Sequence, residues 1–148
     1  MVTELRNKLL IAWGTIAVAV GTYLPWLRTN PNLPPDVEIP TIYYTGMSAG
    51  FEGFDFALLG AVGLVILLHT VDFQTPTPIV VTLVVGVGTA VFPMYYLSSS
   101  TMIGFSATFV PALGWYLTIL GGVLFSVAGG LQLPFVIRRP TPTASTRE

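Results

Sequence analysis

Four apolar stretches follow one another along this chain, and each is long enough to cross a lipid bilayer as a helix. They run approximately over Leu9–Leu27, Phe54–Val71, Ile79–Leu97 and Phe109–Ile137. A hydrocarbon core about 30 Å thick requires roughly 20 mostly apolar residues at helical rise. The pattern therefore predicts an all-α membrane protein, a four-helix transmembrane bundle that forms one domain over residues 1–139.

The polar segments between these stretches predict the loops. Residues 28–53 form the largest loop, expected outside the cell, where several prolines keep the first half extended. Within it, Val37–Tyr44 contains β-favouring side chains that predict a short strand, and one hypothesis pairs this strand with Thr101–Phe109. Asp72–Pro78 is predicted to be a tight inner turn. Residues 140–148 are predicted to be a disordered cytoplasmic tail, because they have nothing to bury.

The composition agrees with burial in lipid and excludes several kinds of function. Only 9% of the residues are charged, against about 25% in a typical soluble domain, and nearly every charge lies outside the predicted spans. The net charge of -1 offers no basic surface for nucleic acid. The chain has no cysteine, which excludes disulfides, thiolate metal sites and cysteine nucleophiles.

The positions of the basic residues predict the orientation in the membrane. Arg6 and Lys8 precede the first span, and Arg138 and Arg139 follow the fourth. Basic residues near span ends favour the cytoplasmic side, so we expect a multi-pass protein of the cell membrane with both termini in the cytoplasm. The alternative is a signal peptide cleaved after Ala17-Val18-Ala19, which would leave three spans.

Small residues recur at a spacing of four on three of the predicted helices. This spacing puts them on one helix face, where small side chains let helix backbones approach closely in lipid. One interpretation is packing within a single bundle, and the other is a face that docks a second copy or another membrane protein. The nine residues are Gly53, Ala57, Ala61, Thr82, Gly86, Ala90, Gly122, Ser126 and Gly130.

Three charged residues of the outer side are candidates for a contact site or the mouth of a channel. Arg28 directly follows the first span. Glu52 and Asp55 lie on either side of the start of the second span, among aromatic residues. A carboxylate near a helix N-terminus also suits the helix dipole. The alternatives are therefore a structural role in an aromatic belt and a contact with a cation or partner.

The sequence contains no recognisable catalytic or cofactor site. His69 is the only histidine, which excludes a bis-histidine haem and a histidine-rich metal site. His69 and Asp72 share a helix face near the inner end of the second span. They are candidates for an inner polar pair that relays a proton or, as we favour, anchors the helix end. We predict no cofactor and no enzymatic activity.

The layout resembles that of claudins, with four spans, cytoplasmic termini, a large first outer loop and a short inner turn. The family's first-loop pattern of a Trp, then Gly-Leu-Trp with two cysteines, is missing here, because Trp26 stands alone and the chain has no cysteine. The chain is also similar to small uncharacterised four-span membrane proteins of prokaryotes, particularly archaea. That similarity includes Leu24-Pro25-Trp26 and Gly114-Trp115-Tyr116-Leu117, and it implies no activity.

Three functional hypotheses remain from the sequence. The first is a non-enzymatic accessory subunit or scaffold that associates with itself or another membrane protein through its small-residue faces and first outer loop, with membrane lipid around it. The second is a homo-oligomeric channel or transporter with Glu52 and Asp55 at its acidic mouth and the hydroxyls of Thr82, Thr89 and Ser126 in its passage. The third, a lipid-modifying enzyme, lacks a nucleophile next to a base.

Overall fold

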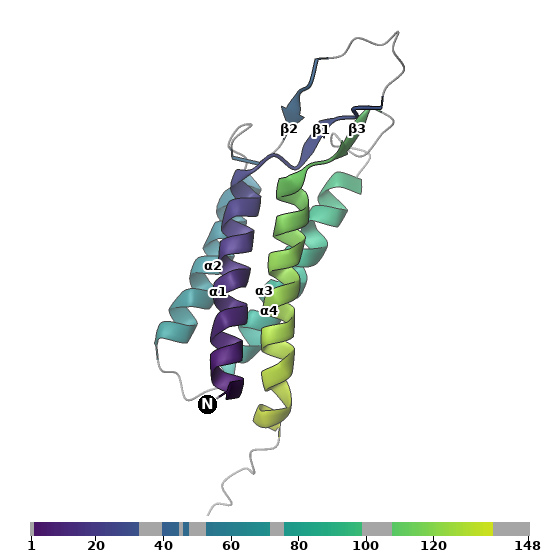
Figure 1. Ribbon diagram of the computed structural model, residues 1–148. Helices are drawn as coiled ribbons and strands as arrows, with labels where there is room; N and C mark the ends of the chain where they lie inside the picture. The colour runs from purple at the N-terminus through teal and green to yellow at the C-terminus, as the bar shows by residue number, and fades with distance from the viewer. Residues whose placement is uncertain are drawn as a thin grey trace, which may run out of the picture.

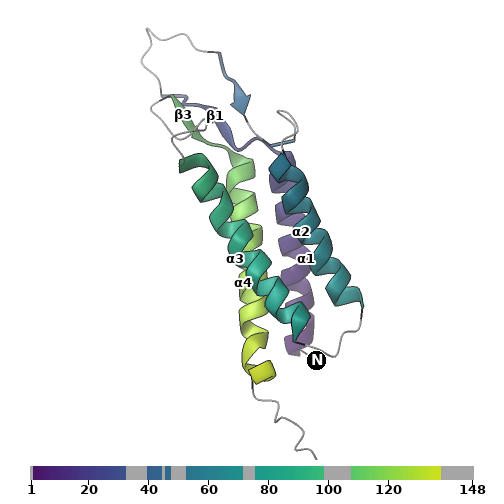
Figure 2. The same ribbon diagram turned by 180° about the vertical axis from the view of Figure 1, so that it is seen from behind.

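Four helices lie side by side, and a small sheet lies at one end of them (Figure 1). The computed structural model describes residues 2–32, 40–44, 46–47, 53–71, 76–98 and 108–137. The helices are α1 (Val2–Tyr23), α2 (Gly53–Thr70), α3 (Thr77–Ser98) and α4 (Leu113–Ile137). Consecutive helices run in opposite directions, so the N-terminus lies at the end away from the sheet, and the view from behind agrees (Figure 2).

Three of the described helices, α2, α3 and α4, have the length and composition of membrane spans. The prediction of a mainly helical chain is confirmed, with three helices that are long and apolar enough to cross a membrane. Helix α1 does not reach the same apolarity, because its first two turns carry Glu4, Arg6 and Lys8. Its apolar part begins only at Leu9, and the fourth span is therefore not confirmed.

The first predicted helix ends earlier than expected and the fourth begins later, and in both places a short strand lies next to the helix end. Helix α1 ends at Tyr23, since Pro25 has no backbone N–H to continue the helix and disfavours helical geometry in the residue before it. The chain then enters β1 (Leu27–Thr29). On the other side, β3 (Phe109–Pro111) precedes α4, which begins only at Leu113. Apolar runs alone do not distinguish a buried strand from a helix.

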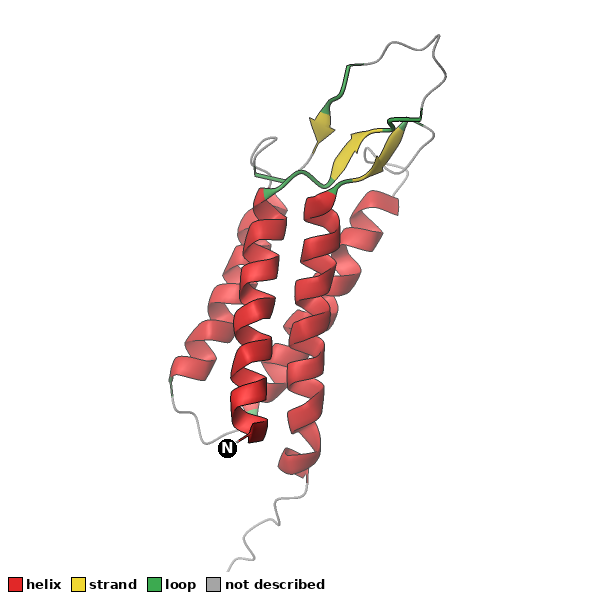
Figure 3. Cartoon of the chain, viewed as in Figure 1, coloured by secondary structure: helices red, strands yellow, loops and turns green. Residues whose placement is uncertain are grey.

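The sheet has the order β2-β1-β3, with both neighbouring pairs antiparallel (Figure 3). Strand β2 (Tyr43–Tyr44) confirms the predicted short strand in the first loop. It pairs with β1. Of its expected partner, Thr101–Phe109, residues 101–107 lie outside the described residues, and Phe109 pairs with β1 instead. The central strand is β1, whose Leu27 faces Tyr44 on one side and Pro111 on the other. The sheet also joins the ends of α1 and α4, because the N–H of Ala112 donates to the carbonyl of Trp26 at 2.8 Å.

Helix α4 packs most extensively, against α3 on one side and α1 on the other. The contact with α3 uses small residues of the predicted faces. A Cβ atom added to Gly122 would lie 2.8 Å from the carbonyl oxygen of Gly86 and would press on the backbone of Ala90. A Cβ atom on Gly86 would similarly meet the side chain of Ser126 at 2.7 Å. These four positions are used for packing within the chain.

The contact between α1 and α4 is equally close. A Cβ atom on Gly21 would lie 2.6 Å from the backbone nitrogen of Thr118, and one on Gly121 would lie 2.8 Å from the carbonyl oxygen of Gly14. Phe125 of α4 is fully buried and would contact a Cβ atom on Gly14 at 3.0 Å. Backbones that approach this closely gain many dispersion contacts, which drive helix association in lipid.

Other members of the predicted small-residue faces lie outside these contacts. Gly130 of α4 and Gly53 of α2 are exposed, and a Cβ atom on either would meet nothing within 4 Å among the described residues. Ala57 is exposed and Ala61 half-buried. Thr82 is buried, and its hydroxyl donates to the carbonyl of Pro78 at 2.7 Å. The face of α2 is therefore not packed as closely as those of α3 and α4.

Two glycines of α4 offer a direct test of this packing. We expect Gly122→Ala to lower the free energy of unfolding by about 1–3 kcal/mol, because the new methyl group forces α3 away. Gly130→Ala should leave it unchanged or raise it by up to about 1 kcal/mol, since alanine favours the helix and meets no neighbour. Thermal unfolding of both variants in detergent, followed by circular dichroism, measures the difference. Equal effects would contradict the assigned contact.

Candidate functional site

A groove between α2 and α3 is one of the spaces that the helices of the described chain leave incompletely filled. Helix α2 makes far fewer contacts with α1 and α3 than those helices make with α4. The space between α2 and α3 has a volume of about 320 Å³. We call it the α2–α3 groove, and its lining residues are Phe54, Ala57, Leu58, Ala61, Val85, Gly88, Thr89 and Phe92.

The groove has small residues on both helices and no ionisable side chain in its lining. Ala57 and Ala61 come from α2 and Gly88 from α3, and a Cβ atom on Gly88 would meet nothing within 4 Å. Thr89 contributes the hydroxyl group of the lining. Such a surface has no groups for acid–base chemistry or for binding ions, and it suits the close approach of another apolar backbone.

An aromatic cluster lies at the end of this groove next to the sheet and connects three helices with the sheet. Trp26 is fully buried at its centre. The ring centroid of Phe54, from α2, lies 4.9 Å from that of Trp26, and Phe92 and Tyr96, from α3, lie at 6.3 and 6.1 Å. The indole N–H of Trp26 donates to the carbonyl of Gly21 at 2.9 Å. Aromatic pairs at these distances are stabilising beyond their buried area.

The charged residues proposed for an outer mouth do not come together at the surface. Asp55 is fully buried in the first turn of α2, where a carboxylate suits the positive end of the helix dipole. Its burial contradicts the alternative of an exposed contact at this residue, and its place in the first turn of α2 fits the structural alternative. Arg28 is exposed on β1. Glu52 lies outside the described residues.

Of the predicted inner polar pair, His69 and Asp72, the structure describes only the histidine. His69 is exposed in the last turn of α2, and its Nδ1 lies 2.9 Å from the carbonyl oxygen of Val65. Because a carbonyl oxygen only accepts hydrogen bonds, Nδ1 carries the proton and donates. The imidazole therefore binds a carbonyl at the helix end, as an anchor would. Asp72 lies outside the described residues.

Two of the three hydroxyls predicted for a channel passage donate to carbonyls of their own helices, and the third, of Thr89, lines the α2–α3 groove. Thr82 donates to Pro78, and Ser126 donates to the carbonyl of Gly122 at 2.9 Å. Ser126 also lies in the contact with Gly86 of α3. Within the described part of the chain, neither of these two hydroxyls is directed to a separate polar path.

Charged groups gather at the opposite end of the bundle, at the start of α1. Lys8 Nζ lies 2.7 Å from Glu4 Oε1, the one ion pair among the described residues. The hydrogen bond from Lys8, and its positive charge, hold the pKa of the Glu4 carboxyl below its usual value. The described residues contain no group of three histidine or carboxylate side chains that could bind a metal.

The aromatic cluster is not predicted by the sequence analysis. Trp26 lies between Pro25 and Leu27 at the end of a predicted span, a place typical of an interfacial tryptophan, but the structure buries it completely. A clearer signal was the spacing of Phe92 and Tyr96 on α3, because residues four apart share one helix face.

No family model, curated protein or solved structure matches this chain. The site is therefore interpreted from its geometry alone.

Trp26 allows the cluster to be tested with a matched control. We expect Trp26→Phe to lower the free energy of unfolding by about 1–3 kcal/mol, because the buried carbonyl of Gly21 loses its donor. Trp13→Phe should change it by less than about 0.5 kcal/mol, since Trp13 is 62% exposed. Chemical unfolding in detergent micelles, followed by circular dichroism, gives both values. A larger loss for Trp13→Phe would refute the assigned role of Trp26.

Proposed function

We propose that the chain is a multi-pass protein of the cell membrane whose four helices all cross the bilayer, with both termini in the cytoplasm. Three helices have the composition of spans. Helix α1 lies along α4 and presents exposed apolar side chains, among them Leu9, Trp13 and Ile16. Arg6 and Lys8 lie at the end of α1 away from the sheet, which favours the cytoplasm for that end.

We propose further that the protein works by association, as an accessory subunit or scaffold for another integral membrane protein. The observation that carries this proposal is the α2–α3 groove. The other close helix pairs, α1 with α4 and α3 with α4, already bring glycine backbones into contact. In the groove, Ala57, Ala61 and Gly88 offer the same kind of surface without a helix against it.

The chemistry of the groove favours a transmembrane helix as the partner. Small residues at helical spacing let two backbones approach, and lipid tails fill such a narrow space less well than an interlocking helix. No ionisable side chain lines the groove, so the partner helix would present apolar or small residues. The first outer loop would add contacts outside the membrane. The channel hypothesis gains no specific observation, because Asp55 is buried.

Labelling of single cysteines tests whether α1 crosses the membrane, and the natural chain contributes no cysteine. Asn32 follows β1, and Glu4 lies near the start of α1. Both positions are exposed, so a cysteine placed at either one can react. We expect an impermeant thiol reagent to label Asn32→Cys on intact cells and Glu4→Cys only after permeabilisation. Thr70→Cys, at the inner end of α2, is the control that should also require permeabilisation. Labelling of Asn32→Cys and Glu4→Cys from one side would overturn the four-span proposal.

Native mass spectrometry of the protein extracted with its lipid tests the association. We expect the natural chain to carry a defined second membrane protein. In Ala57→Leu the amount of this complex should fall at least tenfold, because the larger side chain fills the groove. Val84→Leu is the control, since Val84 is 65% exposed on α3 and does not line the groove.

Two results would contradict the proposal. One is a natural chain that is strictly monomeric and free of partners after mild extraction. The other is an equal loss of the complex in both variants. A closed ring of identical copies would instead support the channel hypothesis.

A further inference from the structure

A second, larger groove runs between α1 and α4 on a different face of the bundle. Its volume is about 860 Å³, and its walls are almost entirely apolar. Large side chains form both walls, with Leu9, Trp13 and Ile16 on α1 and Leu117, Leu120 and Leu124 on α4. We call it the α1–α4 groove.

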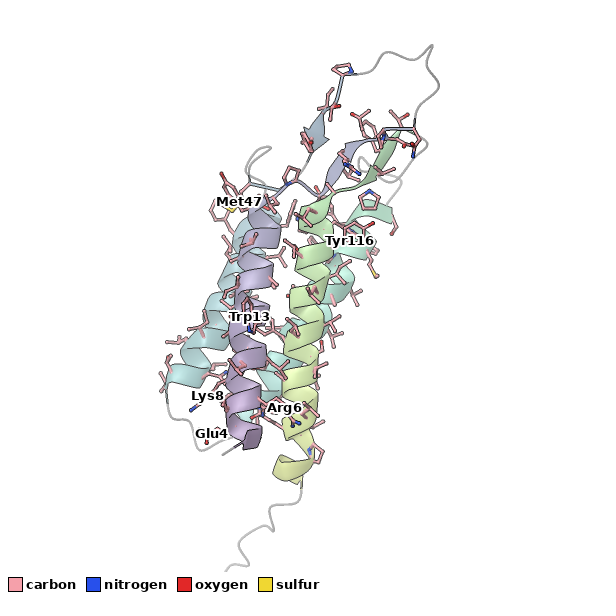
Figure 4. The ribbon with its side chains drawn as sticks, in the orientation of Figure 1. Glu4, Arg6, Lys8, Trp13, Met47 and Tyr116 are labelled. Carbon is pink, nitrogen blue, oxygen red and sulfur yellow. The ribbon has the colours of Figure 1, made fainter. Side chains whose placement is uncertain are left out.

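One end of this groove carries a positive charge. Arg6 belongs to its lining, and its side chain lies on the side of α1 that faces α4, whereas Glu4 and Lys8 lie on the other side (Figure 4). Lys8 is neutralised by Glu4 at 2.7 Å. Among the described residues Arg6 has no carboxylate partner, so its guanidinium is available to an anion at the end of the groove.

The shape and the charge together match a phospholipid. From Leu5 to Val20 the groove follows α1 for roughly 22 Å, which exceeds the roughly 15 Å depth of one leaflet of the hydrocarbon core. We propose that the α1–α4 groove binds an anionic phospholipid, with one acyl chain along its leucine walls and the phosphate group on Arg6. The proposal depends on the crossing of the membrane by α1, which the cysteine labelling tests separately.

The walls of the groove favour a lipid over a protein helix. A second helix needs small residues where the backbones meet, as the α2–α3 groove has in Ala57, Ala61 and Gly88. In the α1–α4 groove Ala17 is the one small residue of the lining, and the others are bulky and more than half of them leucine or tryptophan. A flexible acyl chain adapts to such an uneven surface, and an arginine pairs with a phosphate through two parallel hydrogen bonds.

Trp13 provides a fluorescent reporter inside the groove. It lies seven residues after Arg6, roughly 10 Å further along the helix, at the depth of the acyl chain. The full chain is reconstituted in vesicles of phosphatidylcholine that contain either brominated phosphatidylglycerol or brominated phosphatidylcholine with the same chains. Subtraction of the signal of Trp13→Phe isolates the quenching of Trp13 from that of the other two tryptophans.

We expect brominated phosphatidylglycerol to associate with the groove about fivefold more strongly than brominated phosphatidylcholine, the effect of about one basic residue at an anionic headgroup. Arg6→Gln should reduce this ratio to about one. Lys8→Gln removes the same charge from the same helix end, but outside the groove, and should keep the ratio near five. Ala17→Phe, which fills the groove, should lower the quenching by both lipids.

Three outcomes would overturn the proposal. Equal quenching by the two lipids in the natural chain would show a groove with no preference for anionic lipid. An equal loss of the preference in Arg6→Gln and Lys8→Gln would show a general attraction to the surface of the vesicle. Protection of Trp13 from both lipids in the natural chain would show that protein covers the groove.

Discussion

The close approach of helix backbones along α4 is the constraint on which the rest of the structure depends. In lipid, apolar side chains gain little by leaving their surroundings for one another, so helices associate where backbones come near enough for dense dispersion contacts. Helix α4 offers Gly121 to α1 and Gly122 to α3. Two consecutive glycines thus face two different helices. Helix α2 has no comparable contact with α4, and for this reason it leaves a groove beside α3.

At the sheet end of the bundle, an aromatic contact compensates for the loose packing of α2. Trp26 leaves α1 and packs against Phe54 at the start of α2 and against Phe92 in α3. The same stretch of chain forms the central strand of the sheet, so the aromatic cluster and the backbone hydrogen bonds of β1 hold one another in place. One end of α2 is therefore fixed firmly, while Ala57 and Ala61 further along the helix remain accessible.

The sequence predicted the helices better than it predicted their ends and partners. The bounds of α2 and α3 agree closely with the apolar stretches, because polar turns and loops delimit them. The strands at Leu27 and Phe109 were not foreseen as partners, since hydrophobicity does not distinguish a buried strand from the end of a span. The burial of Asp55 also escaped prediction, because a carboxylate in the first turn of a helix has the same local sequence whether it is exposed or buried.

The pairing of β1 with β3, and of α1 with α4, joins the first and last parts of the chain. Contacts between residues so distant in sequence form late, after the loss of chain entropy that closing a long loop requires. During synthesis α1 is therefore complete long before its main partner, α4, has been made. The face of α1 that carries Gly14 and Gly21 has no α4 to pack against until the last helix has been made.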